Sequence, residues 1–155
     1  MNFEEIIYSS EPTNKALDVI SIDQTESVLF NDFEEDIFKR AVLVKLDNVP
    51  VIITSFETKA DSSKFISMLK SEENVLKVLH KNRSDINRHE TTVTQTKSSA
   101  LNDKFLSGYF NATGIEYSLY IRNSKFSYNE QMMELNEYIL PGLKFIMKKY
   151  ENLIS

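Results

Sequence analysis

Two charged residues of opposite sign, Arg40 and Glu137, fall on the more apolar sides of two predicted β-strands. Side chains alternate across a strand, so Arg40 shares a face with the apolar even-numbered residues of 37–46, and Glu137 with the apolar odd-numbered residues of 131–139. Burying a charge without a partner is costly. The pattern therefore indicates a buried ion pair, a bulge that changes strand parity, or a pocket. In the pocket interpretation, Arg40 binds a carboxylate and Glu137 meets a polar group at the other end of the ligand.

The strands that carry these residues belong to a predicted α+β domain, an antiparallel sheet covered by a few helices. Two β-rich runs around the short turn Asp47-Asn48 predict a hairpin over 37–46 and 49–56. Alternation and helical spacing of apolar residues predict the other elements. These are strands at 84–97, 115–122 (with Ile115, Tyr117, Leu119 and Ile121 on one face) and 131–139, and helices at 63–70, at 100–110 ending at Gly108, and at 143–154 after Pro141-Gly142.

Composition limits the class of protein. The chain has 155 residues, of which 41% are hydrophobic, so we expect a single domain over 1–155 with a real core. The absence of cysteine excludes disulfides, zinc ribbons and thiol nucleophiles. The net charge of -5 argues against a nucleic-acid partner, and no apolar run is long enough to span a membrane. Without a secretion signal, a soluble cytoplasmic protein is expected.

Two other polar features have simpler interpretations. The two histidines, His80 and His89, are too far apart for a local metal motif, and no metal site is predicted. The acidic residues within 18–36 indicate a solvated, loop-like stretch.

The chain also resembles the chorismate lyase family in the segments around Arg40 and Glu137. The first match is 37–44 (IFKRAVLV) followed by 47–53 (DNVPVII), and the second is 118–126 (SLYIRNSKF) leading into 132–141 (MMELNEYILP). Between them, 74–79 (NVLKVL) and 86–90 (INRHE) resemble the middle of the family. The likeness covers roughly residues 7–142 in the same order.

The resemblance implies a six-stranded antiparallel sheet with helices that enclose a buried site. It implies conversion of chorismate to a hydroxybenzoate, with 4-hydroxybenzoate the expected isomer, and pyruvate, by a monomer that needs no metal or organic cofactor. Arg40 would hold the ring carboxylate, Glu137 would meet the far end of the ring, and the backbone amide at Val75 would help hold the carboxylate. A fixed guanidinium suits an anionic substrate, and aromatisation leaves the protein mainly positioning and proton transfer to perform.

The sequence departs from the family pattern at three places. Pro12 falls where a backbone N–H normally touches the carboxylate, Leu76 replaces a glycine, and Ser55 replaces an arginine. A C-terminal helix over about 142–154 also extends beyond the usual end. These departures fit a divergent lyase that uses Arg40 and Glu137. They also fit a non-catalytic module that binds an aromatic acid.

The same fold serves as the effector-binding (UTRA) domain of some transcription regulators, and this chain has no room for a DNA-binding domain, so a free-standing ligand binder is the alternative. A third interpretation is an interaction protein in which Arg40 and Glu137 form a structural pair.

Overall fold

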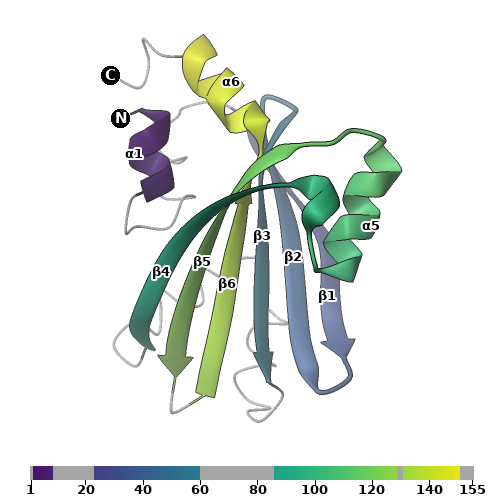
Figure 1. Cartoon of the computed structure of the whole chain (residues 1–155), viewed down its shortest axis with the longest axis vertical. Helices are drawn as coiled ribbons and strands as arrows, with labels where there is room; N and C mark the ends of the chain where they lie inside the picture. Colours follow the sequence, from purple (N-terminus) through teal and green to yellow (C-terminus); the bar gives the residue numbers. More distant parts are fainter. Residues whose placement is uncertain (1, 9–22, 60–85, 129–130, 151–155) are drawn as a thin grey trace.

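The fold is a six-stranded, fully antiparallel sheet with helices on both faces (Figure 1). The structure, a computed structural model, describes residues 2–8, 23–59, 86–128 and 131–150. The strand order is β1-β2-β3-β6-β5-β4. The strands are β1 (Gln24–Glu34), β2 (Ile37–Leu46), β3 (Val49–Lys59), β4 (Ile86–Lys97), β5 (Ser118–Tyr128) and β6 (Gln131–Ile139). The helices are α1 (Phe3–Tyr8), the short 3₁₀ turn η2 (Ser98–Ala100), α5 (Lys104–Thr113) and α6 (Pro141–Lys149). The predicted α+β class is confirmed.

The predicted hairpin forms from β2 and β3. Leu46 pairs with Val49 across a two-residue turn, in which Asp47 and Asn48 have φ values of 50° and 63°. Positive φ at both central residues matches the right-handed twist of the flanking strands, and Asp and Asn tolerate this conformation. The turn therefore sets the register of the two strands.

One end of one sheet face is covered by α1 and α6. Their apolar residues pack on Val44 and Leu46 of β2, on Val51 and Ile52 of β3 and on Ile139 of β6, in a single buried cluster. Helix α6 approaches the hairpin so closely that a Cβ on Gly142 would collide with the carbonyl oxygen of Pro50. The final helix is thus confirmed, beginning at Pro141 and described as far as Lys149. The rest of the predicted 143–154 segment lies outside the described residues.

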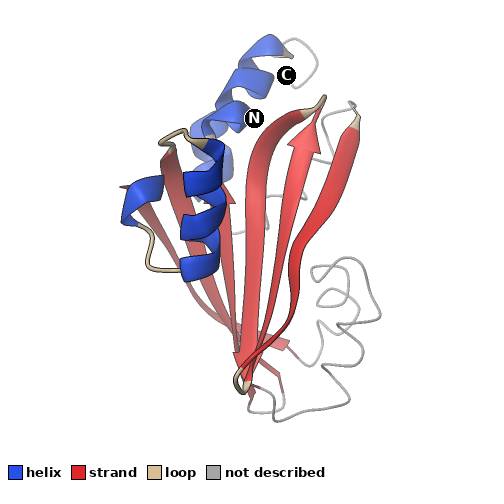
Figure 2. Ribbon diagram, turned by 90° about the vertical axis from the view of Figure 1, so that its right-hand side faces the viewer, coloured by secondary structure: helices blue, strands red, loops and turns tan. Residues whose placement is uncertain are grey.

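The opposite face is covered by α5 (Figure 2). Leu106 and Phe110 of this helix pack against Leu43, Ile53 and Leu119 of the sheet. The prediction that the helix ends at Gly108 is wrong. The helix continues to Thr113, because buried Phe110 anchors the next turn and outweighs the roughly 1 kcal/mol propensity cost of an internal glycine. Gly114, with φ 71°, supplies the left-handed cap instead.

Two strands differ from their predicted bounds. The strand predicted at 115–122 begins at Ser118 and runs to Tyr128, so Ile115 precedes it and is exposed, while Leu119 and Ile121 pack toward α5. Part of the stretch interpreted as a solvated loop forms β1. β1 is an edge strand that pairs with β2 alone, so its other edge borders solvent and its acidic residues can stay in contact with water. The polar strand at 84–97 is confirmed as β4, and the helix predicted at 63–70 lies outside the described residues.

We predict that Asp103→Ala destabilises the domain by about 1–2 kcal/mol. The Asp103 carboxylate caps α5 by accepting a hydrogen bond of 3.0 Å from the Leu106 amide, and it also accepts one of 3.2 Å from Lys39 Nζ. Urea unfolding of the full chain measures the change. Asn102→Ala, at the exposed neighbouring residue, is the control, and equal stability of the two variants would contradict this account of the cap.

Candidate functional site

Arg40 and Glu137 lie on the same face of the sheet, as strand parity predicts. Arg40 on β2 pairs with Phe56 on β3, which in turn pairs with Leu135 on β6, two residues before Glu137. Two strand spacings of about 4.8 Å and a two-residue step of about 6.8 Å place the Cα atoms of Arg40 and Glu137 roughly 12 Å apart. Both side chains are buried, with residue exposures of 2% and 1%.

The direct partner of Glu137 is Arg122 on β5. The two residues are opposite one another in the β5–β6 register, and Arg122 Nη1 lies 3.4 Å from Glu137 Oε1. Their side chains are 0% and 2% exposed. The ion pair left open by the sequence therefore exists, but it joins Glu137 to Arg122 and not to Arg40.

Sequence reasoning missed Arg122 as a site residue. The prediction for 115–122 concerned the odd-numbered face, which carries Ile115, Tyr117, Leu119 and Ile121, whereas Arg122 lies on the even-numbered face. β5 lies inside the sheet, between β6 and β4, and both of its faces carry buried residues: Leu119 on one, Arg122, Ser124 and Phe126 on the other. The signal that could have identified the site residue is Arg122 itself, a basic residue on the even-numbered face of β5.

The face around these charges is mostly apolar. Phe56 on β3 pairs with Arg40 on one side and with Leu135 on the other, so Phe56 and Leu135 lie between Arg40 and Glu137. Both are buried. Further along, Thr91 and Ser124 hydroxyls share a hydrogen bond of 3.2 Å. In the described part of the chain, the charged residues that are buried are Arg40, Arg122 and Glu137, and all of them belong to this face. We call this set the charged triad.

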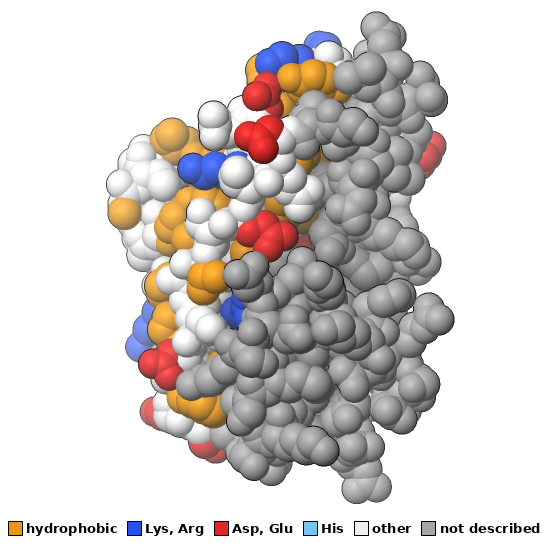
Figure 3. Space-filling model, turned by 180° about the vertical axis from the view of Figure 1, so that it is seen from behind, with side chains coloured by type: hydrophobic (Ala, Val, Ile, Leu, Met, Phe, Trp, Pro, Cys, Tyr) orange, Lys and Arg blue, Asp and Glu red, His pale blue; other side chains and the backbone are white. Residues whose placement is uncertain are grey.

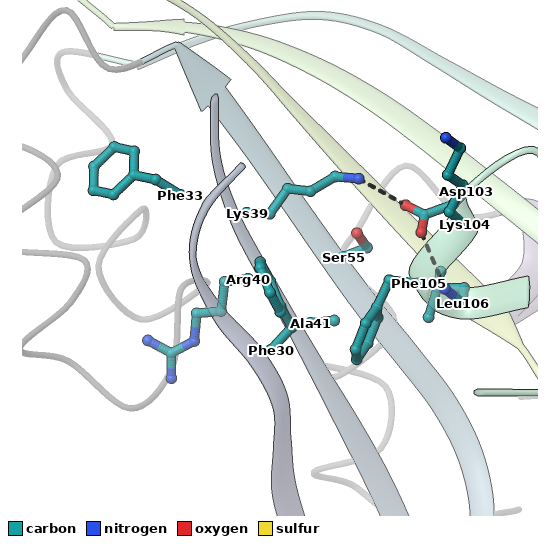
Figure 4. A pocket seen from close by; sticks show the side chains of 10 residues that line it. All are labelled: Phe30, Phe33, Lys39, Arg40, Ala41, Ser55, Asp103, Lys104, Phe105 and Leu106. Atoms are coloured by element: carbon teal, nitrogen blue, oxygen red, sulfur yellow. Dashed lines mark hydrogen bonds and ion pairs between the residues drawn. The ribbon is translucent and has the colours of Figure 1, made fainter. Parts of the chain in front are cut away.

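A pocket of about 360 Å³ opens on the other side of the same strands, under the first turn of α5 (Figure 4). Lys39 reaches across it to Asp103, at 3.2 Å, and also lies 3.6 Å from Glu57. The Arg40 side chain points away from this Lys39–Asp103 pair (Figure 4). The lining residues are Phe30, Phe33, Lys39, Arg40, Ala41, Ser55, Asp103, Lys104, Phe105 and Leu106. This pocket is therefore not the space into which the Arg40 guanidinium projects.

Other predicted site residues have different outcomes. Pro12, Val75 and Leu76 lie outside the described residues. Ser55 is buried opposite Ala41 and lines the α5-side pocket, so its side chain faces away from the charged triad. The arginine that Ser55 replaces in the family pattern would consequently not add a cation beside Arg40.

Tyr138 belongs to the buried cluster under α5. Burial, with smaller contributions from nearby acidic groups, raises the pKa of Tyr138, which therefore stays a neutral phenol.

On the side of the molecule shown in Figure 3, acidic and basic side chains of the described residues are interspersed and form no broad basic patch. Neither a membrane-length apolar helix nor a group of three or more potential metal-ligating side chains occurs within the described ranges.

The sequence matches no family model and no curated protein, but several solved structures are similar to this chain, two of them domains of regulatory proteins. One is the C-terminal domain of histidine utilization repressor from Pseudomonas syringae pv. tomato, with 11% identity, 77% of this chain and 92% of that chain covered, and a TM-score of 0.50. The other is the ligand-binding domain of a GntR-family transcriptional regulator from Bordetella bronchiseptica, with 10% identity, coverage of 78% and 88%, and a TM-score of 0.49. Identities this low concern the fold alone, which is the predicted α+β arrangement of a six-stranded antiparallel sheet with flanking helices.

We predict that Glu137→Leu costs about 3–5 kcal/mol of stability, because it leaves the buried Arg122 charge without its carboxylate. The double variant Arg122→Met/Glu137→Leu should lose less than the Glu137→Leu single variant, since both charges are then replaced by apolar groups. Urea unfolding of the wild type, the two single variants and the double variant closes the cycle. A double variant whose loss equals the sum of the single losses would contradict coupling between the two residues.

Proposed function

We propose that this chain is a small-molecule-binding domain that takes an aromatic carboxylate on the face carrying the charged triad. The observation behind the proposal is that the buried charges of the described residues gather on one sheet face, Arg40 on β2 and the Arg122–Glu137 pair on β5 and β6. A buried guanidinium is well suited to a carboxylate, because its planar fork donates two parallel hydrogen bonds.

The spacing supports a ligand with one ring. Phe56 and Leu135 provide an apolar floor beside Arg40, and Glu137 stands one step further along on β6. A ring between Arg40 and Glu137, which are roughly 12 Å apart at their Cα atoms, would rest on this floor with a polar group toward each end. 4-Hydroxybenzoate has these features.

The fold comparison supports binding ahead of turnover. The similar chain with a TM-score of 0.50 is the C-terminal domain of a repressor, a protein whose name describes regulation and not catalysis. The site points the same way. Glu137 lies against a guanidinium and not in purely apolar surroundings, which suits a fixed hydrogen-bond acceptor.

A second candidate function is chorismate lyase activity. Arg40 and Glu137 lie on one buried face, as the resemblance to the lyases implies. In that reaction Arg40 would hold the ring carboxylate while the ring loses its enolpyruvyl group and a proton, giving a hydroxybenzoate and pyruvate. Glu137 would contact the far end of the ring.

We predict that the full chain binds 4-hydroxybenzoate and that Arg40→Gln weakens binding about 10- to 100-fold, the loss expected for a charge-assisted hydrogen bond of about 1.5–3 kcal/mol. Isothermal titration calorimetry measures both affinities. Lys45→Gln makes the same change of charge on the same strand but on the opposite face, and it should leave the affinity unchanged. Absence of binding by the wild type, or equal effects of the two variants, would contradict the proposed site.

Incubation with chorismate separates the two candidate functions. A binding domain leaves chorismate intact, whereas a lyase releases hydroxybenzoate and pyruvate in equal amounts, both measurable by chromatography. Release that is abolished by Arg40→Gln and retained by Lys45→Gln would favour the second candidate.

A further inference from the structure

The pocket beneath the first turn of α5 lies on the sheet face opposite the charged triad, and part of its lining is apolar. Two phenylalanine rings line it in mutual contact, Phe30 from β1 and Phe105 from α5, with centroids 5.3 Å apart. Ala41 and Leu106 line it as well, and both are buried. The volume of about 360 Å³ is near the lower end of the range of about 300–1,000 Å³ that is typical of small-molecule sites. The apolar part therefore suits a ligand with one aromatic ring.

A buried hydroxyl also faces this pocket. Ser55 is 4% exposed, and its oxygen is directed toward the Lys39–Asp103 ion pair (Figure 4). Among the residues that the structure describes, none makes a hydrogen bond with this hydroxyl. Buried hydroxyls in proteins are rarely left without a hydrogen bond. A polar group of a bound molecule can supply the partner that the described protein groups do not.

The polar end of the pocket carries more carboxylates than ammonium groups. Lys39 Nζ lies 3.2 Å from Asp103 Oδ2 and 3.6 Å from Glu57 Oε1. Asp32 on β1 is opposite Lys39 in the strand register, which adds a third carboxylate to the same face. Lys104, the other lysine of the lining, is exposed, and its ammonium points out of the pocket (Figure 4). One ammonium among three carboxylates favours a ligand that brings a cation over one that brings an anion.

We propose that this pocket binds an arylalkylamine, a molecule that carries one aromatic ring and a protonated amine on a short chain. The ring rests against Phe30 and Phe105, whose faces also attract a nearby cation. The ammonium donates hydrogen bonds to the Asp103 carboxylate and to the Ser55 hydroxyl oxygen. This site is separate from the proposed carboxylate site and selects the opposite charge.

Asp103 can serve this ligand while it keeps its structural contacts. Its carboxylate accepts hydrogen bonds from the Leu106 amide and from Lys39 Nζ, one on each oxygen. An ionised carboxylate offers about four lone-pair positions, so a third donor can be accommodated. Binding of the amine therefore requires neither loss of the α5 cap nor rupture of the Lys39–Asp103 pair.

Three probes with a phenyl ring and the same two-carbon spacer test the charge preference: 2-phenylethylamine, 2-phenylethanol and 3-phenylpropionate. Isothermal titration calorimetry on the full chain at pH 7 and constant ionic strength should show the amine binding at least about tenfold more tightly than the other two. Saturation with 4-hydroxybenzoate should leave the affinity for the amine unchanged, because the carboxylate site is on the other face of the sheet.

Two variants test the residues that receive the ammonium. Ser55→Ala should weaken binding of 2-phenylethylamine at least about fivefold and leave urea stability unchanged, since it removes a hydroxyl that no described residue uses. Asp103→Asn retains an oxygen that can cap α5 and removes the charge, so it should weaken binding at least about tenfold. Glu26→Gln is the matched control, because Glu26 is an exposed carboxylate on β1 opposite Val44, which packs with α1 and α6 on the other face. It should leave the affinity unchanged.

The outcomes separate this inference from the proposed function. Equal affinity for the three probes, competition by 4-hydroxybenzoate, or unchanged amine binding in both Ser55→Ala and Asp103→Asn overturns the amine site. Binding of 4-hydroxybenzoate without binding of the amine overturns this inference alone, and the reverse result overturns the proposed function alone. Amine binding that weakens in Ser55→Ala and Asp103→Asn but persists in Glu26→Gln supports the site.

Discussion

The antiparallel register of the four central strands is the constraint on which the rest of the molecule depends. It brings Arg122 opposite Glu137 and places Arg40 two strands beyond Glu137, on the same face. Since successive side chains point to opposite sides, the same register assigns Lys39, Ala41 and Ser55 to the face under α5. The two faces thus share a backbone but differ in chemistry. One carries three buried charges on an apolar floor, and the other has an open pocket crossed by a partly exposed ion pair.

The buried Arg122–Glu137 pair adds little net stability, because the cost of removing two ions from water offsets most of their attraction. Well-packed apolar residues at the same positions often stabilise a core as much. What the pair supplies is a defined arrangement of charge in a place that apolar residues would leave neutral. In the proposed function the pair contributes to ligand binding, because it lies on the same sheet face as Arg40.

The sequence was most informative where both strands of a pair had regular alternation. The β2–β3 hairpin and the inward positions of Arg40 and Glu137 could be predicted, because turn chemistry and parity are local properties. Arg122 could not, because the usual assumption of one wet face fails for an interior strand with two covered faces. The acidic strand β1 and the far end of α5 were missed for a related reason. Pairing with β2 and burial of Phe110 are tertiary effects that override local preference.

The two-residue turn at Asp47 and Asn48 has a consequence for evolutionary change in this chain. Its two left-handed residues define the pairing of Leu46 with Val49, so both the length of the turn and its tolerance of positive φ matter for the alignment of the strands. A single inserted residue that moved β2 by one position would transfer Arg40 to the α5 side and bring Lys39 and Ala41 to the other. Descendants of this gene should accordingly keep the length of the turn and exchange its two residues mainly among Asn, Asp and Gly, which tolerate positive φ.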